Sequence, residues 1–157
     1  MKYNGLGGSG KGLTMKPTIM RMTMDNDMDQ DDEMNYVPDM DMVGDFGGRL
    51  LMSAPIIHML HLQTDSFAKH LALGELYDSL PDTTDVVLEE FQGCYSIISS
   101  YNTYVTYTAN PTIFVEDLLD YVRKNRHCMG PSTSINSNID IIETSIKACL
   151  YKLKNLK

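Results

Sequence analysis

The sequence has no apolar run that approaches the roughly 18 to 20 residues of a membrane-spanning helix, which excludes an integral membrane protein. The amino-terminal residues are rich in glycine and lack an apolar segment, so a secretory signal is not expected. Cysteine is scarce: Cys94, Cys128 and Cys149 are odd in number and lie far apart without CxxC spacing. A disulfide scaffold and a zinc knuckle are therefore not expected, and a reducing, cytosolic setting fits best.

Clusters of lysine and arginine are also missing. The 157 residues carry 13 bases against 21 acids, which gives a formal net charge of −8 at pH 7. Residues 1–24 hold four bases and no acid, whereas residues 25–45 hold nine acids and no base. A nucleic-acid-binding surface needs clustered bases, so nucleic acid is not an expected partner, and neither is a membrane.

A change in composition predicts two parts. Residues 1–48 are expected to form a flexible arm rich in Gly, Met and Asp, and residues 49–157 a helical bundle domain. Residues 24–34 have too little apolar surface and too much like charge to offset the entropy of ordering them. Residues 43–48, Val-Gly-Asp-Phe-Gly-Gly, are expected to close the arm as a hinge.

Apolar residues recur at helical spacing after residue 50. They predict a first helix at about 51–80, with Pro81 as a break or a first-turn proline, and a second at about 82–107. Asn110-Pro111 predicts the start of a third helix and Gly130-Pro131 its stop, before a last helix at about 135–156. The strand-like residues 101–108 are interpreted as a fraying helix end. Four helices joined by short loops predict an all-α, antiparallel four-helix bundle.

Three motifs in the arm have ordinary explanations. Residues 5–12 nearly match a phosphate-binding loop, but Gly12 replaces the hydroxyl that binds magnesium, so a flexible linker is favoured. The alternating Asp25 to Asp31 lack the Gly and Glu of a calcium loop. Methionines could offer thioethers to Cu(I), although packing on a partner surface is favoured; they are Met20, Met22, Met24, Met40 and Met42.

Histidines and carboxylates repeat at helical spacing in the domain. His58, His61 and Asp65 stand at i, i+3 and i+7, and Asp82, Asp85 and Glu89 repeat this spacing. Such a pattern suits a metal site, but it is also typical of an ordinary solvated helix face.

The spacing of His58, His70, Asp85 and Glu89 resembles four of the five ligand positions of the ferroxidase site in Dps-type miniferritins, members of the ferritin-like superfamily. Residues 56–93 and 151–156 also resemble a family of small, uncharacterised tailed-phage proteins regarded as ferritin-like. The resemblance implies a ferritin-like bundle, iron or another divalent transition metal, and Fe(II) oxidation. It also implies a homo-oligomer, at least a two-fold dimer, in the cytoplasm of a bacterial host or in a virion.

This sequence departs from the miniferritin pattern at two positions. Gly74 stands where the family has an aspartate, and Met59 where it has an aromatic residue. Either His58 or His61 could be the first ligand. If residues 64–92 form one helix, His70 and Asp85 lie about 22 Å apart at 1.5 Å per residue, so only a two-fold dimer could join them. If Pro81 breaks the helix into a hairpin, one chain could join them.

Two functions follow as hypotheses. The first is a ferritin-like, phage-encoded metal-binding protein, a candidate ferroxidase, with His70, Asp85 and Glu89 as the leading ligands and His58 or His61 completing the site. The alternative is a non-enzymatic virion structural or assembly protein on a ferritin-like scaffold, whose arm contacts other virion proteins and is ordered by neighbouring subunits. A Met-rich copper carrier is a third and weaker hypothesis.

Overall fold

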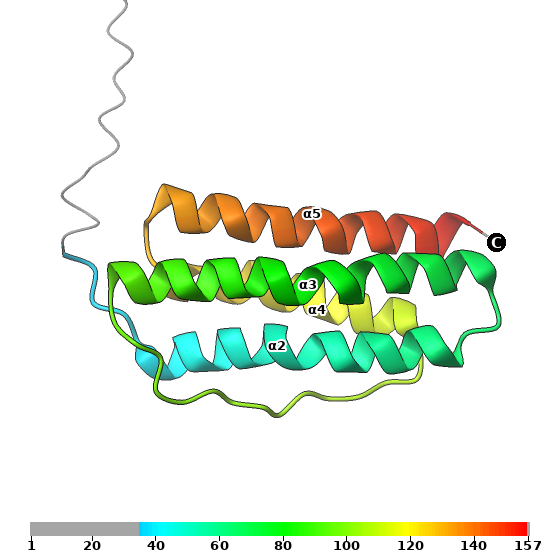
Figure 1. Cartoon of the computed structure of the whole chain (residues 1–157), viewed down its shortest axis with the longest axis horizontal. Coiled ribbons are helices and arrows are strands. Elements are labelled where there is room, and N and C mark those ends of the chain that lie inside the picture. Colours follow the sequence, from blue (N-terminus) through cyan, green and yellow to red (C-terminus); the bar gives the residue numbers. More distant parts are fainter. Residues whose placement is uncertain (1–34, 157) are drawn as a thin grey trace, which may run out of the picture.

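A computed structural model describes residues 35–156, and this part of the chain is all-helical (Figure 1). It comprises α2 (Met40–Gln63), α3 (Phe67–Cys94), α4 (Pro111–Asn125), a 3₁₀ turn η1 (Arg126–Met129) and α5 (Thr133–Asn155). The expected all-α class is confirmed. The phosphate-loop-like segment, the aspartate run, Met20 to Met24 and most of the predicted arm lie outside the described residues.

Helix α2 begins earlier than the sequence predicted. The Asp39 side chain caps it by accepting hydrogen bonds from the backbone N–H groups of Asp41 and Met42 at 3.1 and 3.2 Å. Val43 and Phe46 are fully buried in the core. The expected hinge at residues 43–48 is therefore wrong, because these glycine-rich residues form part of a packed helix that begins before residue 49.

The first turn between helices also lies elsewhere than expected. The chain breaks at residues 64–66, where Ser66 caps α3 by accepting a hydrogen bond from the Lys69 N–H. Helix α3 then runs through Pro81 to Cys94. The predicted helices at 51–80 and 82–107 and the break at Pro81 are wrong, because one buried stripe, which includes Leu76, Leu80, Val87 and Phe91, continues across the proline.

Each helix in the described bundle packs against antiparallel neighbours: α2 contacts α3 and α4, and α5 contacts α3 and α4. Figure 1 shows α3 and α4 running in the same direction, because the connection over residues 95–110 traverses the length of the bundle along α2. The expectation that all loops are short is thus wrong. The expected helix end at 101–108 is wrong as well, since these residues are neither helix nor strand.

Glycines on α2 give this crossover connection its path. A Cβ at Gly44 would lie 2.3 Å from the Ser100 carbonyl oxygen, and a Cβ at Gly48 only 2.0 Å from that of Asn102. The two glycines stand four residues apart and therefore share one helix face. The crossover backbone lies directly on this face, which side chains would block.

The second half of the chain follows the predicted signals. Asn110 caps α4 by accepting from the Thr112 and Ile113 N–H groups, and Pro111 is its first residue. Gly130 ends η1 with a φ of 84°, a conformation that favours glycine. Helix α5 lies close to the predicted last helix and buries a stripe that includes Ile139, Ile142, Ile146 and Leu153. None of the described helices has the length and apolar character needed to cross a membrane.

Candidate functional site

Three of the predicted site residues gather where α2 meets α3. His58 and His61 lie in the last turns of α2, and His70 lies in the first turn of α3. The rings of His61 and His70 stack with centroids 3.6 Å apart at an interplanar angle of 27°. The ring of His58 lies 5.9 Å from that of His61 and stacks on Tyr77 at 4.2 Å.

Reciprocal hydrogen bonds orient the inner histidine pair. The Nδ1–H of His61 donates to the His70 carbonyl oxygen at 2.7 Å, and that of His70 donates to the His61 carbonyl at 3.2 Å. A carbonyl oxygen only accepts, so both rings carry their proton on Nδ1 when neutral. Each Nε2 therefore retains its lone pair. Histidines that bind metals are held in this way, with the second nitrogen donating to a carbonyl or carboxylate.

Gly74 provides room for the His61 ring. A Cβ at position 74 would lie 3.3 Å from His61 Cε1, which is closer than side chains normally pack, and 3.4 Å from His61 Nδ1. Glycine at this position therefore allows the His61 imidazole to pack closely on α3.

The carboxylates lie further along the same helix. Asp85 and Glu89 are exposed, stand one turn apart on α3, and share its outer face with Asp78 and Asp82. Because α3 is continuous, Asp85 lies about 22 Å along the helix from His70. The hairpin alternative at Pro81 is wrong. Asp65 lies exposed in the turn between α2 and α3. Within residues 35–156, no three His, Cys, Asp or Glu side chains gather closely enough to hold a metal ion.

The bundle interior offers no alternative carboxylate cluster among the described residues. Glu143 is the one buried carboxylate there, and Arg123, Arg126 and Lys147 pair with it at 2.8–3.2 Å. Burial alone raises the pKa of Glu143, but the hydrogen bonds and charges of these three cations outweigh it and hold that pKa below its usual value. Glu143 is therefore an ion-paired structural group.

Comparison with known protein families gives one match. Residues 61–153 match the model of DUF5856, a family of unknown function. The chain belongs to this family. No curated protein and no solved structure matches it.

The segment shared with the DUF5856 family begins at His61 and includes His70, Asp85 and Glu89. His58 lies before this segment. The family match therefore covers the inner histidine pair and both leading carboxylates, and it leaves out the histidine that stacks on Tyr77.

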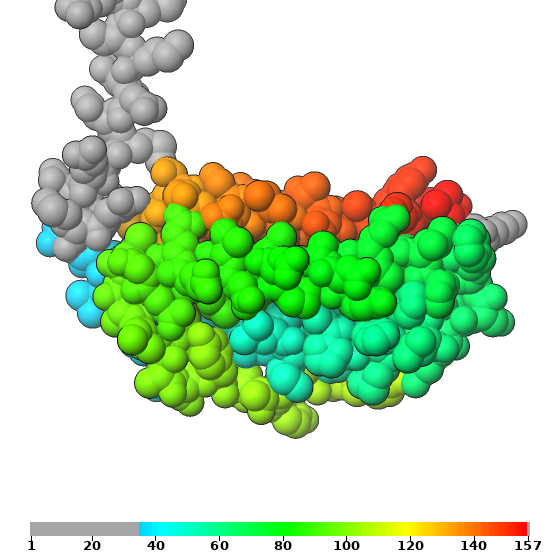
Figure 2. Space-filling model, in the orientation of Figure 1, coloured from blue at the N-terminus to red at the C-terminus, as the bar shows by residue number. Residues whose placement is uncertain are grey.

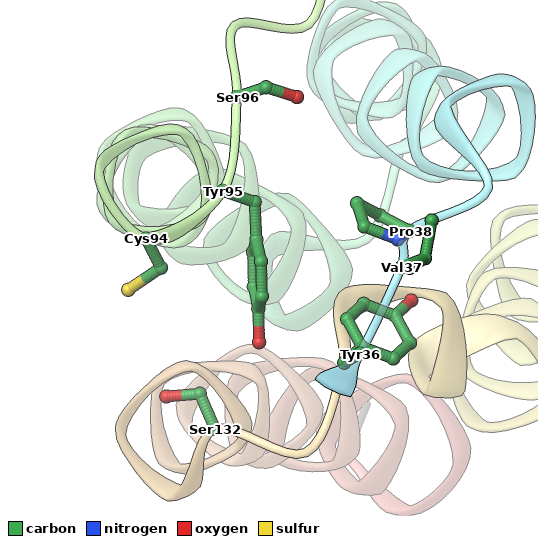
Figure 3. A pocket seen from close by; sticks show the side chains of 7 residues that line it. All are labelled: Tyr36, Val37, Pro38, Cys94, Tyr95, Ser96 and Ser132. Atoms are coloured by element: carbon green, nitrogen blue, oxygen red, sulfur yellow. The ribbon is translucent and has the colours of Figure 1, made fainter. Parts of the chain in front are cut away.

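A cavity of about 590 Å³ lies at the opposite end of α3 from the histidines (Figure 3). It is lined by Tyr36, Val37, Pro38, Cys94, Tyr95, Ser96 and Ser132. Figure 3 shows the Cys94 sulfur on the far side of the Tyr95 ring from Tyr36. Its described lining contains no histidine and no charged side chain, so it has none of the donors that distinguish the histidine pair.

Reasoning from the sequence missed Tyr77 and the pairing of His61 with His70. Tyr77 could have been found, because positions 70, 74 and 77 share one face of a helix. The pairing required the turn at 64–66, and no proline or glycine marks that turn.

Proposed function

We propose that this member of the DUF5856 family is a ferritin-like, phage-encoded protein that binds iron or another divalent transition metal between two copies of the chain. The observation that carries the proposal is the separation of two half-sites along α3, one at the His70 end, where His61 of α2 stacks on His70, and one at Asp85 and Glu89. His61 and His70 offer oriented nitrogen donors, and Asp85 with Glu89 offers carboxylates about 22 Å away.

A dimer with two-fold symmetry would bring these half-sites together. If two α3 helices pack antiparallel, the histidines of each copy meet the carboxylates of the other, and two equivalent sites result. Figure 2 shows α3 along the whole length of one face, uncovered by other described helices. The axis would pass close to Asp78, which lies midway between the half-sites and is exposed.

The topology supports the ferritin-like part of the proposal. Ferritin-like bundles combine antiparallel neighbours with one long crossover between two helical hairpins. Residues 95–110 make such a crossover between α3 and α4.

The donor types suit iron. Imidazole and carboxylate ligands bind Fe(II), and a bound iron with an open coordination position would supply oxidation by oxygen or peroxide. The part of this chain would be to present an imidazole nitrogen from the His61–His70 pair and two carboxylates one turn apart. Location in the cytoplasm of a bacterial host, or in a virion, belongs to the same proposal.

Anaerobic Fe(II) titration followed by exposure to oxygen tests this function. We expect the wild type to bind and oxidise iron, and Glu89→Gln to lose at least about tenfold in affinity through loss of a ligand. His70→Asn is the matched histidine variant, because its amide can still donate to the His61 carbonyl while the Nε2 ligand is gone. Asp120→Asn removes an exposed carboxylate on α4 and serves as the control. A wild type that neither binds nor oxidises iron would refute the proposal.

A non-enzymatic virion or assembly protein is the second candidate. The observation that favours it is an exposed apolar group at the end of the α2–α3 hairpin, where Leu62, Phe67 and Leu71 are 69%, 74% and 48% exposed. Such a group is typical of a protein contact surface. Metal-free protein that incorporates normally into phage particles would favour this candidate over the first.

A further inference from the structure

The crossover connection between α3 and α4 contains an extended stretch whose backbone faces α2 along one edge. Residues 96–108 contain no helix, turn or bend, and Figure 1 shows them running along α2. The Asn102 N–H donates to the Gly44 carbonyl oxygen at 3.4 Å. The Asn102 carbonyl oxygen lies on Gly48, where a Cβ would collide with it. Both backbone groups of Asn102 therefore face α2.

Strand geometry places the neighbouring backbone groups on the opposite edge. In an extended chain the N–H and C=O of one residue point to the same side, and those of the next residue point to the other side. Since Asn102 faces α2, the backbone groups of Thr103, Val105 and Tyr107 point away from it. Within residues 35–156, none of these N–H and C=O groups makes a hydrogen bond. An unpaired edge of this kind is a template for another strand.

The residue types of this stretch suit a β-strand. Residues 103–108 are all tyrosine, threonine or valine, which are enriched in strands. Tyr101 and Val105 pack against the core, whereas Tyr104 and Tyr107 are 81% and 47% exposed. The fold thus holds the stretch in place on one side and leaves it open on the other.

The absence of charge indicates which partner fits this edge. Residues 95–110 contain no charged side chain, although the chain has a formal net charge of −8. Two copies can therefore bring this stretch together without placing like charges opposite each other, which would weaken the pairing. We propose that residues 103–107 of two copies pair as antiparallel β-strands about a two-fold axis at Val105. This interface goes beyond the proposed function, which uses the outer face of α3.

The direction of the backbone groups restricts the register of this pairing. Residues that exchange hydrogen bonds must both face outward, so Thr103 pairs with Tyr107 of the second copy, and Val105 pairs with its own counterpart. Tyr104 then lies opposite Thr106. Aromatic and β-branched pairs across two strands stabilise a sheet. A shift by one residue would set outward-facing groups against inward-facing ones and break the hydrogen bonds.

Two proline variants of the full chain test the pairing by sedimentation velocity over about 1–500 µM protein. We expect the wild type to dimerise in this range. Thr103→Pro removes an outward-facing N–H from each copy, so its dissociation constant should rise at least about tenfold. Thr106→Pro is the matched control, because its N–H lies on the edge that faces α2, and it should dimerise like the wild type. Far-ultraviolet circular dichroism checks that both variants keep their helices.

Amide hydrogen exchange of the wild type provides a second measurement that needs no variant. We expect a rise in protein concentration to slow exchange at Thr103, Val105 and Tyr107. Exchange at Tyr104 and Thr106 should not change, because these N–H groups lie on the other edge. This alternation would distinguish strand pairing from the contact of two side-chain surfaces.

The opposite outcomes are equally definite. A wild type that stays monomeric, with no protection of residues 103–107 at high concentration, would overturn the inference. A dimer that Thr103→Pro retains is held by another face of the molecule and would overturn it too, as would equal loss in both proline variants. Each of these results leaves the proposed function standing, since iron binding is measured separately. Failure to bind iron would in turn leave this interface intact.

Discussion

Burial separates the three cysteine thiols into one reactive and two inert groups. Burial raises the pKa of both Cys128 and Cys149 to about 12, whereas Cys94 is exposed at the end of α3. The thiolate is the reactive form, so the buried thiols are almost entirely unreactive at pH 8. We expect iodoacetamide to alkylate Cys94 alone in the native protein and all three cysteines in denaturant, as measured by peptide mass spectrometry. Native labelling of Cys149 at a comparable rate would contradict this.

Glu143 makes the stability of the bundle depend on acid. Its pKa in the folded state lies below the unfolded value of about 4.5, so its ion pairs stabilise the fold above that pH. This contribution is lost as the pH falls through the lower folded-state pKa. We expect Glu143→Gln to reduce the free energy of unfolding at pH 7 by about 2 kcal/mol, since charged hydrogen bonds contribute ~1.5–3 kcal/mol. The loss should shrink toward pH 3, as measured by urea unfolding.

At the residue scale, the sequence allowed candidate ligand side chains to be predicted, but it did not allow their contacts in the fold to be predicted. The spacing of His58, His61 and His70 predicted donors on one helix, whereas the structure divides them between two helices. Glycine at position 74 was interpreted as a missing carboxylate. That it admits His61 could not be read from spacing, because the contact depends on how α2 packs against α3.

At the element scale, the glycine face of α2 is tested by adding single methyl groups. Gly48→Ala would place a Cβ 2.0 Å from the Asn102 carbonyl oxygen. A backbone atom cannot move aside cheaply, so we expect destabilisation by about 1–3 kcal/mol. Gly93→Ala is the matched control on α3, where a Cβ meets nothing within 4 Å and should stabilise by up to about 1 kcal/mol. Thermal unfolding followed by circular dichroism measures both, and equal melting temperatures would refute the contact.

Helix boundaries were predictable where capping residues mark them. Asn110 and Gly130 set the limits of the α4–η1 segment as the sequence indicated. The prediction of a hinge at residues 43–48 was wrong because it takes glycine as a sign of backbone freedom. In the structure, these glycines instead allow the backbone of the crossover connection to lie close to α2. The prediction of a helix break at Pro81 was wrong because the burial of apolar side chains on both sides of Pro81 outweighs the preference of proline against a helix interior.

At the scale of the whole molecule, a single cysteine can test the proposed two-fold axis. Asp78 would lie on that axis, so in a Cys94→Ser background Asp78→Cys should place two thiols within disulfide reach of about 4.4–6.8 Å between Cα atoms. We expect mild oxidation with diamide to give a covalent dimer on a non-reducing gel. Asp120→Cys on α4 is the matched control in the same background and should cross-link far more slowly. Equal rates at the two positions would refute the axis.

The contacts of Tyr36 determine how a mechanical force applied to the preceding residues would be transmitted to the bundle. Its hydroxyl donates to the Cys128 carbonyl at 2.6 Å, and its ring meets that of Tyr95 edge-on at 5.4 Å. A Cβ at Gly130 would lie 2.9 Å from the Tyr36 ring, so the absence of a side chain at Gly130 leaves the space that this ring occupies. Tension applied through residues 1–34 would therefore be shared among η1, the end of α3 and the start of α2. The bundle would resist as a mechanical anchor instead of unravelling from the first turn of one helix.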